Sequence, residues 1–323
     1  MEEFTFTIDD LEFYGTGLSR PECVCCLESG VVFVSNDQGG VSRIDPDGTT
    51  RHITAPDGAH KPMTNGFAIT QQGDFLLADL SLEGGVWKLQ ADGTCEPLIK
   101  EVDGETLPST NFVGVDAKNR VWATVSTRHS PRSLAYRKDV ADGYIVLSDE
   151  RGTRIVAEGV GYTNEAIVNP AGDFLVVNET MGRRTSRYRI KDDGSLGARE
   201  TVTEYGEGVY PDGLAFDEEG AFWMTSVLSN RLIRVTPDGG QTVIFEDSDP
   251  EMLAVCEAAY QGGKLSAEHM GNVVSKLAKS ISSIAFGGPD RRTGYLGNLL
   301  DNRIYTFKSP VAGAVPSHWG LKV

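Results

Sequence analysis

The sequence predicts an all-β protein, a six-bladed β-propeller with a short helical insertion on the active face. Two observations carry this prediction. One four-strand pattern recurs six times, and 37 glycines are spread along the chain, as many tight turns require. The 323 residues suffice for one large all-β domain, so we expect a single propeller domain over residues 1–323.

Two recurring phrases define the repeat. The first is a short apolar strand, a polar turn and a second strand, as in NGFAITQQGDFLLAD at 65–79. The second is a basic or aromatic strand followed by a polar turn that ends in Gly, as in GVWKLQADG at 85–93. Each unit therefore has about four strands, which is one propeller blade. The sixth unit lacks an outermost strand, and we expect residues 4–15 to supply it and close the ring.

The innermost strand of each blade opens on a polar residue in a constant register before the following turn. In a propeller, equivalent positions of the innermost strands lie on one ring around the axis. Asx residues also begin strands simply by capping turns, and this alternative applies to any one of them. Several oxygen donors in one register, without His or Cys, predict a divalent cation, Ca²⁺ first and Mg²⁺, Mn²⁺ or Zn²⁺ as alternatives. The ring residues are Glu22, Asn65, Asn111, Asn164 and Asp212, with Ser282 in the same register.

These positions carry a family resemblance. The motifs RPECV (20–24), TNFVGVD (110–116), YTNEAIV (162–168) and YPDGLAFDEEG (210–220) resemble the senescence marker protein / gluconolactonase / luciferin-regenerating enzyme family, which includes the diisopropyl fluorophosphatase type of hydrolase. The resemblance implies a six-bladed propeller with one catalytic divalent metal on its axis. Carried over position by position, the resemblance implies that Asn65 contacts a metal-bound water or the substrate. It also implies that the metal ligands are Glu22, Asn111, Asn164 and Asp212.

Two positions depart from the family pattern. Ser109 stands where sugar lactonases of this family have Arg, which argues against an aldonolactone as substrate. Glu165 replaces the Gly that usually follows the Asn of its motif, so its side chain either points toward the site or lies at the surface.

Two long loops are expected to cover the metal face. Residues 126–142 form one, and residues 246–280 form the helical insertion. Asp249 and Pro250 mark a helix start, and Ser266 can cap a second helix. The insertion is interpreted as a lid, with a packing insertion or a dimer contact as the alternative. The first helix is expected to carry Met252, Val255, Cys256, Ala259 and Tyr260, and the second Met270, Val273, Val274 and Leu277.

The function predicted from these features is a divalent-metal-dependent lactonase or ester hydrolase that acts on a small cyclic ester. Asp212 and Asn111 are the predicted catalytic residues, with Asp212 as proton acceptor or nucleophile. Asp79, His129 or Glu165 are alternative bases. A phosphotriesterase-like or non-hydrolytic metal enzyme, or a non-catalytic binding propeller with a structural ion, remains the alternative. The predicted substrate-binding residues are Asn65, Asp79, His129, Glu165 and Tyr260.

Net charge limits the classes of partner to be expected, and cysteine content indicates the cellular compartment. A formal net charge of −16 argues against binding to nucleic acid or to an anionic membrane, which leaves a small-molecule substrate as the expected partner. The N-terminal residues show neither the basic nor the apolar region of a signal peptide. Five cysteines, an odd number without a CxxC pair, predict reduced thiols and a cytoplasmic location. The oligomeric state is left open.

Overall fold

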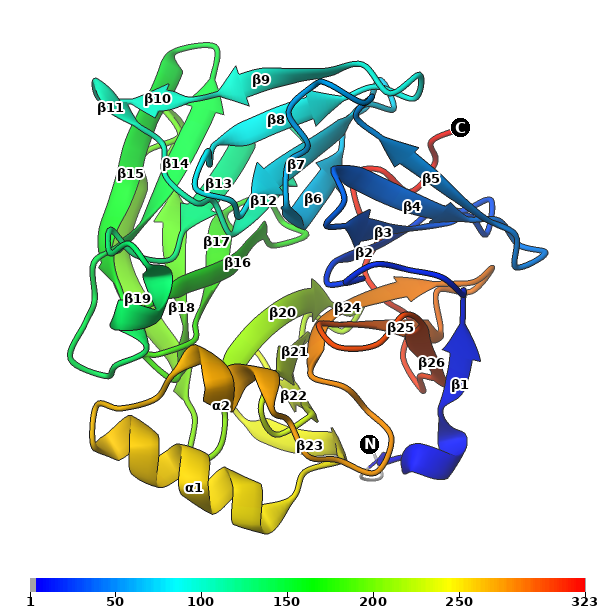
Figure 1. Cartoon of the computed structure of the whole chain (residues 1–323), viewed down its shortest axis with the longest axis vertical. Helices are drawn as coiled ribbons and strands as arrows, with labels where there is room; N and C mark the ends of the chain where they lie inside the picture. Colours follow the sequence, from blue (N-terminus) through cyan, green and yellow to red (C-terminus); the bar gives the residue numbers. More distant parts are fainter. Residues whose placement is uncertain (1–3, 323) are drawn as a thin grey trace.

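Six four-stranded antiparallel sheets surround a central axis in the computed structural model, which describes residues 4–322 (Figure 1). The predicted six-bladed propeller is therefore confirmed. A two-stranded hairpin of β10 (Glu101–Val102) and β11 (Glu105–Thr106) lies beside the blades. From the axis outward the first three blades are β2 (Val24–Cys26), β3 (Val32–Asn36), β4 (Gly40–Ile44), β5 (Thr50–Thr54); β6 (Thr64–Ile69), β7 (Phe75–Asp79), β8 (Val86–Leu89), β9 (Cys95–Ile99); and β12 (Phe112–Val115), β13 (Val121–Val125), β14 (Gly143–Asp149), β15 (Gly152–Val160).

The remaining three blades follow the same plan, and the ring closes on itself. The innermost strand of the last blade contacts those of the fifth and the first blades. These blades are β16 (Thr163–Val168), β17 (Phe174–Glu179), β18 (Arg184–Ile190), β19 (Leu196–Glu204); β20 (Pro211–Phe216), β21 (Phe222–Ser226), β22 (Arg231–Val235), β23 (Gln241–Glu246); and β24 (Ile281–Gly287), β25 (Thr293–Asn298), β26 (Ile304–Lys308), β1 (Glu12–Tyr14).

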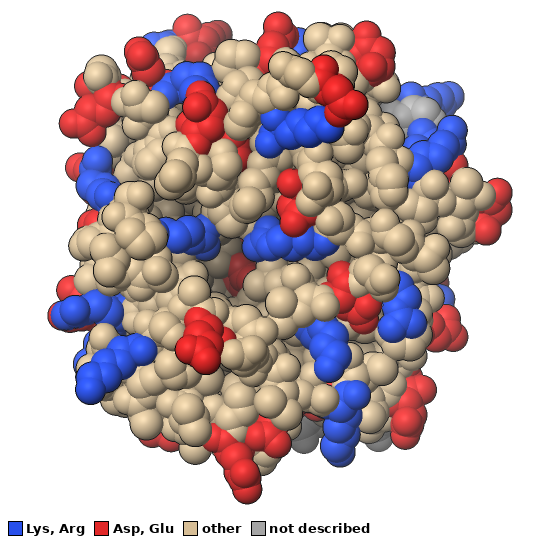
Figure 2. All heavy atoms as spheres, viewed as in Figure 1, with Lys and Arg blue, Asp and Glu red and all other residues tan. Residues whose placement is uncertain are grey.

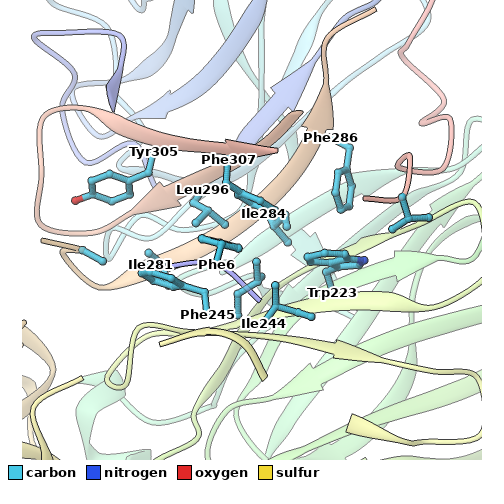
Figure 3. Packing of buried hydrophobic residues seen from close by; sticks show 13 residues of the cluster. Phe6, Trp223, Ile244, Phe245, Ile281, Ile284, Phe286, Leu296, Tyr305 and Phe307 are labelled. Atoms are coloured by element: carbon cyan, nitrogen blue, oxygen red, sulfur yellow. The ribbon is translucent and has the colours of Figure 1, made fainter. Parts of the chain in front are cut away.

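The N-terminal segment completes the last blade, as predicted. Strand β1 pairs antiparallel with β26, with Phe13 opposite Tyr305. Just before it, Phe6 donates its backbone N–H to Ile244 O at 3.1 Å, and this contact ties the segment to the fifth blade as well. The Phe6 ring stacks on Phe245 at 4.9 Å and on Phe307 at 4.4 Å between centroids, and it fills the core between the two blades (Figure 3).

The Phe6→Ala variant should lose about 3–5 kcal/mol of unfolding free energy, because it empties a packed aromatic site at the closure of the ring. Denaturant unfolding measures this loss. Leu82→Ala is the control, because Leu82 is 87% exposed and its truncation should leave stability within about 0.5 kcal/mol of the parent. Equal stability of the Phe6 variant and the control would contradict the proposed closure.

The helical insertion is partly as predicted. Helix α1 (Pro250–Gln261) begins at the expected Pro, and the Asp249 side chain accepts the Met252 N–H at 2.7 Å. The second helix, α2 (Ala267–Gly271), is capped by Ser266 as expected but is much shorter than predicted. The prediction that it carries Val273, Val274 and Leu277 is wrong.

The early end of α2 has a local cause. Gly271 and the two β-branched residues that follow Asn272 are poor helix formers. The carboxylate of buried Asp247 then accepts the backbone N–H groups of residues 276–278 at 2.7–3.0 Å, which holds that segment as a loop instead of a helix.

Helix α1 is anchored to the propeller at the turn between β17 and β18. Arg183 pairs with Glu257 at 2.6 Å, and its guanidinium lies 3.8 Å from the centroid of the Tyr260 ring. The Tyr260 hydroxyl donates to Met181 O at 2.6 Å. These contacts fix the helix on the rim of the propeller. No helix within residues 4–322 is both long and apolar enough to cross a membrane.

Candidate metal centre

The polar residues that open the innermost strands converge in the structure. Asn65 Nδ2 donates to Glu22 Oε1 at 3.0 Å and to Asn111 O at 2.8 Å. Asn111 Nδ2 donates to Asn164 Oδ1 at 2.6 Å. Asp212 lies beside Asn164 and within reach of the charge of Glu22. All five side chains are buried, so residues from five blades form one polar ring around the axis.

Backbone irregularities coincide with three of the five ring residues, Asn65, Asn164 and Asp212. The pairing of β6, β16, β20 and β24 with the next strand is shifted in register near the start of each innermost strand. Such a bulge turns a side chain out of the strand alternation, which is common beside active sites. Gly213 follows Asp212, and a Cβ there would lie 2.4 Å from Ser282 O, so Gly is needed for the close approach of β20 and β24.

One carboxylate oxygen of the ring has no hydrogen-bond partner in the described part of the chain. Glu22 Oε2 is buried and accepts no hydrogen bond from any residue in 4–322. Burial raises the pKa of Glu22 to about 7, although Arg20, Arg132 and a hydrogen bond from Asn65 lower it. Burial also raises the pKa of Asp212 well above its usual value, and the charge of Glu22 raises it further.

A hard divalent cation fits this donor set. The ring offers carboxylate and carboxamide oxygens, which are the ligands that Ca²⁺ prefers. A cation near Glu22 Oε2 would supply the missing partner and offset the repulsion between the two carboxylates. Within residues 4–322 no group of three or more His, Cys, Asp or Glu side chains is arranged to hold a metal ion, so the candidate centre depends on carboxamides as well.

Comparison with known proteins places this arrangement in a family. The SMP-30/Gluconolactonase/LRE-like region matches residues 20–246, a span that contains every ring residue from Glu22 to Asp212. The chain belongs to this family. It is 27% identical to a 6-deoxy-6-sulfogluconolactonase of Pseudomonas putida over 270 residues, which cover 82% of this chain and 77% of the relative.

Solved structures of low sequence identity share the fold of this SMP-30/gluconolactonase/LRE-like protein. A gluconolactonase from Xanthomonas campestris superposes with a TM-score of 0.69 at 16% identity, covering 93% of this chain and 89% of the other. A calcium-binding regucalcin from Agrobacterium tumefaciens gives a TM-score of 0.69 at 16% identity, covering 99% of both chains.

Two arginines that the sequence reasoning missed reach the ring of this family member. Arg20 Nη1 donates to Asn65 Oδ1 at 2.7 Å. Arg132 comes from the 3₁₀ turn η2 (Arg132–Ala135) in the loop 126–142, and its Nη2 donates to Asn111 Oδ1 at 3.4 Å. Figure 2, viewed from the same side as Figure 1, shows a hollow near the centre of the molecule with basic side chains on both sides of it. Arg20 stands two residues before Glu22, a signal that was available, whereas the path of the loop that delivers Arg132 has no sequence signature.

Asp79 and His129, both predicted to contact substrate, make other contacts. Asp79 is fully buried, accepts the backbone N–H groups of Met63 and Ser81 at 2.9 Å, and lies 2.7 Å from His60 Nε2. His129 is partly exposed, and its Nδ1 lies 2.9 Å from Asp142 Oδ2. Within residues 4–322, no side-chain hydrogen bond joins Asp79 or His129 to the ring.

Glu165 and Tyr260 are also placed by the structure. Glu165 is not a surface residue: it is 3% exposed, its Oε2 accepts the Leu214 N–H at 2.8 Å, and it faces an axial cavity of about 490 Å³. Burial raises the pKa of Glu165 well above its usual value. Tyr260 belongs to the anchor of α1, where its hydroxyl is already engaged by Met181 O.

Proposed function

We propose that this protein is a divalent-metal-dependent lactonase-type hydrolase that acts on a small cyclic ester. The observation that carries the proposal is the buried, unpartnered Glu22 Oε2 in a ring of oxygen donors on the axis. Membership of the SMP-30/gluconolactonase/LRE-like family and the similarity to a sulfogluconolactonase support the lactonase chemistry. The regucalcin neighbour, described as calcium-binding, supports Ca²⁺ as the first choice of ion.

Glu22, Asn111, Asn164 and Asp212 would hold the ion. When bound, a divalent cation polarises an ester carbonyl and lowers the pKa of a nearby water. Asp212 accepts the proton of the attacking water, or attacks the carbonyl carbon directly. In the first case the water oxygen bonds to the carbonyl carbon, the ring C–O bond breaks, and the proton is returned to the leaving alkoxide. In the second case an Asp212 oxygen bonds to the carbonyl carbon as the ring C–O bond breaks, and a water then cleaves the resulting mixed anhydride, restores the Asp212 carboxylate and protonates the alkoxide. Asn65, already bonded to Glu22 and Asn111, orients the substrate or the water.

Acid release from a panel of lactones, followed at constant pH, tests this function. We expect activity with at least one lactone, its loss by about 10²-fold or more on treatment with EDTA, and its return with Ca²⁺. A fluorophosphate is included in the same panel, and its hydrolysis in preference to every lactone would favour the phosphotriesterase alternative over the lactonase. Full activity after exhaustive removal of divalent ions would refute the metal dependence, and inactivity on every lactone would refute the hydrolase assignment.

A further inference from the structure

We propose that the substrate carries an anionic group, and that Arg20 and Arg132 bind this group beside the metal centre. This inference rests on the function proposed above and narrows its substrate class to cyclic esters that bear a carboxylate, sulfonate or phosphate substituent. Three independent observations carry it: the formal charge of the site, the hydrogen-bond donors that its arginines leave unused, and the way in which both arginines are held.

The formal charges of the two ring carboxylates and the two arginines beside them sum to zero before any ion binds. Glu22 and Asp212 bring two negative charges, and Arg20 and Arg132 bring two positive ones, close enough for each arginine to act on both carboxylates. A divalent cation would add two positive charges to this buried region. Uncompensated charge in a desolvated site is costly, and a neutral lactone would leave it in place. An anionic substituent on the substrate offsets it.

The two guanidinium groups keep donors free. A guanidinium has five N–H donors. Within residues 4–322, Arg20 donates one side-chain hydrogen bond, to Asn65, and Arg132 donates two, to Asn111 and to the Tyr162 hydroxyl. Neither arginine forms an ion pair with a carboxylate in this part of the chain.

Other arginines of the propeller are used differently. Arg183 makes two hydrogen bonds to the carboxylate of Glu257, at 2.6 and 3.0 Å, and Arg184 makes two to Glu179, at 2.6 and 2.8 Å. Such two-point pairing to a carboxylate is the strongest use of a guanidinium. Arg20 and Arg132 have no such carboxylate partner among the described residues. Both are half-buried beside the candidate metal centre, so their unused N–H donors are accessible to the oxygens of an anionic ligand.

Both side chains are positioned in advance of binding. The Arg20 backbone adopts a left-handed φ of 46°, and its carbonyl accepts the Glu22 N–H at 2.7 Å, which fixes the arginine relative to the carboxylate. Arg132 lies 5.4 Å from the centroid of the Tyr162 ring and donates its Nε–H to the Tyr162 hydroxyl at 2.7 Å. Their partners Asn65 and Asn111 are hydrogen-bonded to each other at 3.3 Å, so the two cations converge on one side of the ring. Preorganised donors of this kind lower the entropic cost of binding.

A matched pair of lactones tests the proposal. D-Glucono-1,4-lactone and D-glucaro-1,4-lactone share the ring and differ at C6, which is a neutral hydroxymethyl in the first and a carboxylate in the second. With Ca²⁺-loaded protein we expect kcat/KM to be about 30-fold higher for the glucaro-lactone, as charge-assisted hydrogen bonds imply. Arg20→Gln and Arg132→Gln should each lower this preference about 10-fold, and Arg132→Lys should retain part of it.

Arg137→Gln is the control variant for the lactone pair. Arg137 lies on the same loop as Arg132, is exposed, and pairs only with Asp139 among residues 4–322. We expect this variant to keep the parental preference. Thermal unfolding of all variants verifies that they are folded.

A binding measurement gives a readout that does not depend on turnover. Calorimetric titration of Ca²⁺-loaded protein with D-glucose 6-sulfate and with D-glucose should show about 30-fold tighter binding of the sulfate ester, and the Arg20→Gln/Arg132→Gln double variant should bind both sugars alike. Hydrolysis of both lactones without preference, together with equal binding of both sugars, would overturn the anion site and leave the lactonase proposal standing. Tight binding of the sulfate ester without hydrolysis of any lactone would support the anion site and overturn the lactonase.

Discussion

The Asp212→Asn protein is expected to hydrolyse its best lactone about 10³-fold more slowly than the parent. The substitution keeps the size of the side chain but removes one of the two carboxylates from the ring and the proposed proton acceptor with it. Its contact with Asn164 can persist, so the fold should be retained. Initial rates at saturating Ca²⁺ measure the loss, and near-parental thermal unfolding shows that the loss is not due to misfolding.

Asp238→Asn is the matched control for this experiment. Asp238 belongs to the same blade, in the exposed turn between β22 and β23, where its side chain accepts the Thr236 hydroxyl and the Gly240 N–H. We expect this variant to keep the parental rate. Full activity of the Asp212 variant would remove that residue from the proposed mechanism.

The affinity for Ca²⁺ should rise about 10²-fold between about pH 5 and about pH 7, because the ion competes with a proton on Glu22. Burial raises the pKa of Glu22 to about 7, so the carboxyl is mostly protonated at the lower pH and must release its proton when the ion binds. The raised pKa of Asp212 acts in the same direction. Calorimetry in buffers of different ionisation enthalpy counts the protons released.

The sign of the effect on stability follows from the same shift. Because the pKa of Glu22 is higher in the folded than in the unfolded chain, the metal-free protein is favoured below the unfolded pKa and loses that contribution as pH rises through about 7. Added Ca²⁺ should therefore raise the melting temperature more at high than at low pH. Glu22→Gln removes this titration and should weaken both the binding and its pH dependence. A Ca²⁺ affinity that is flat from pH 5 to pH 8 would contradict the assignment of Glu22 as a ligand.

The propeller and its ring were predictable because both depend on local, repeated patterns. Each blade carries its own turn residues and strand alternation, and rotational repetition places equivalent positions on one circle. The register of Glu22, Asn65, Asn111, Asn164 and Asp212 therefore translates directly into spatial proximity. Strand β1 was predictable for a different reason, since an unpaired edge in the last blade requires a partner.

The surroundings of the ring were less predictable because they depend on contacts between distant segments. Helix α2 is followed by a loop instead of further helix because Asp247, some 30 residues earlier in the sequence, accepts the backbone N–H groups of Leu277 and Ala278. Arg132 reaches Asn111 only through the course of an irregular loop. The spacing of Tyr260 predicted its place on a helix, but it did not predict that its hydroxyl donates to Met181 O, 79 residues earlier in the chain. Propensity and periodicity carry no information about such partners.

The pairing of β1 with β26 also bears on biosynthesis. During translation, Phe13 leaves the ribosome long before Tyr305, with which it must pair, so β1 stays unpaired until β26 has been made. Contacts of such large sequence separation slow folding. The Ser282 hydroxyl donates a hydrogen bond to Glu22 O, and this contact also joins the last blade to the first. In a nascent chain without the blade that contains Ser282, Glu22 lacks this hydrogen bond, and we expect the proposed ion site to form only after that blade has been made.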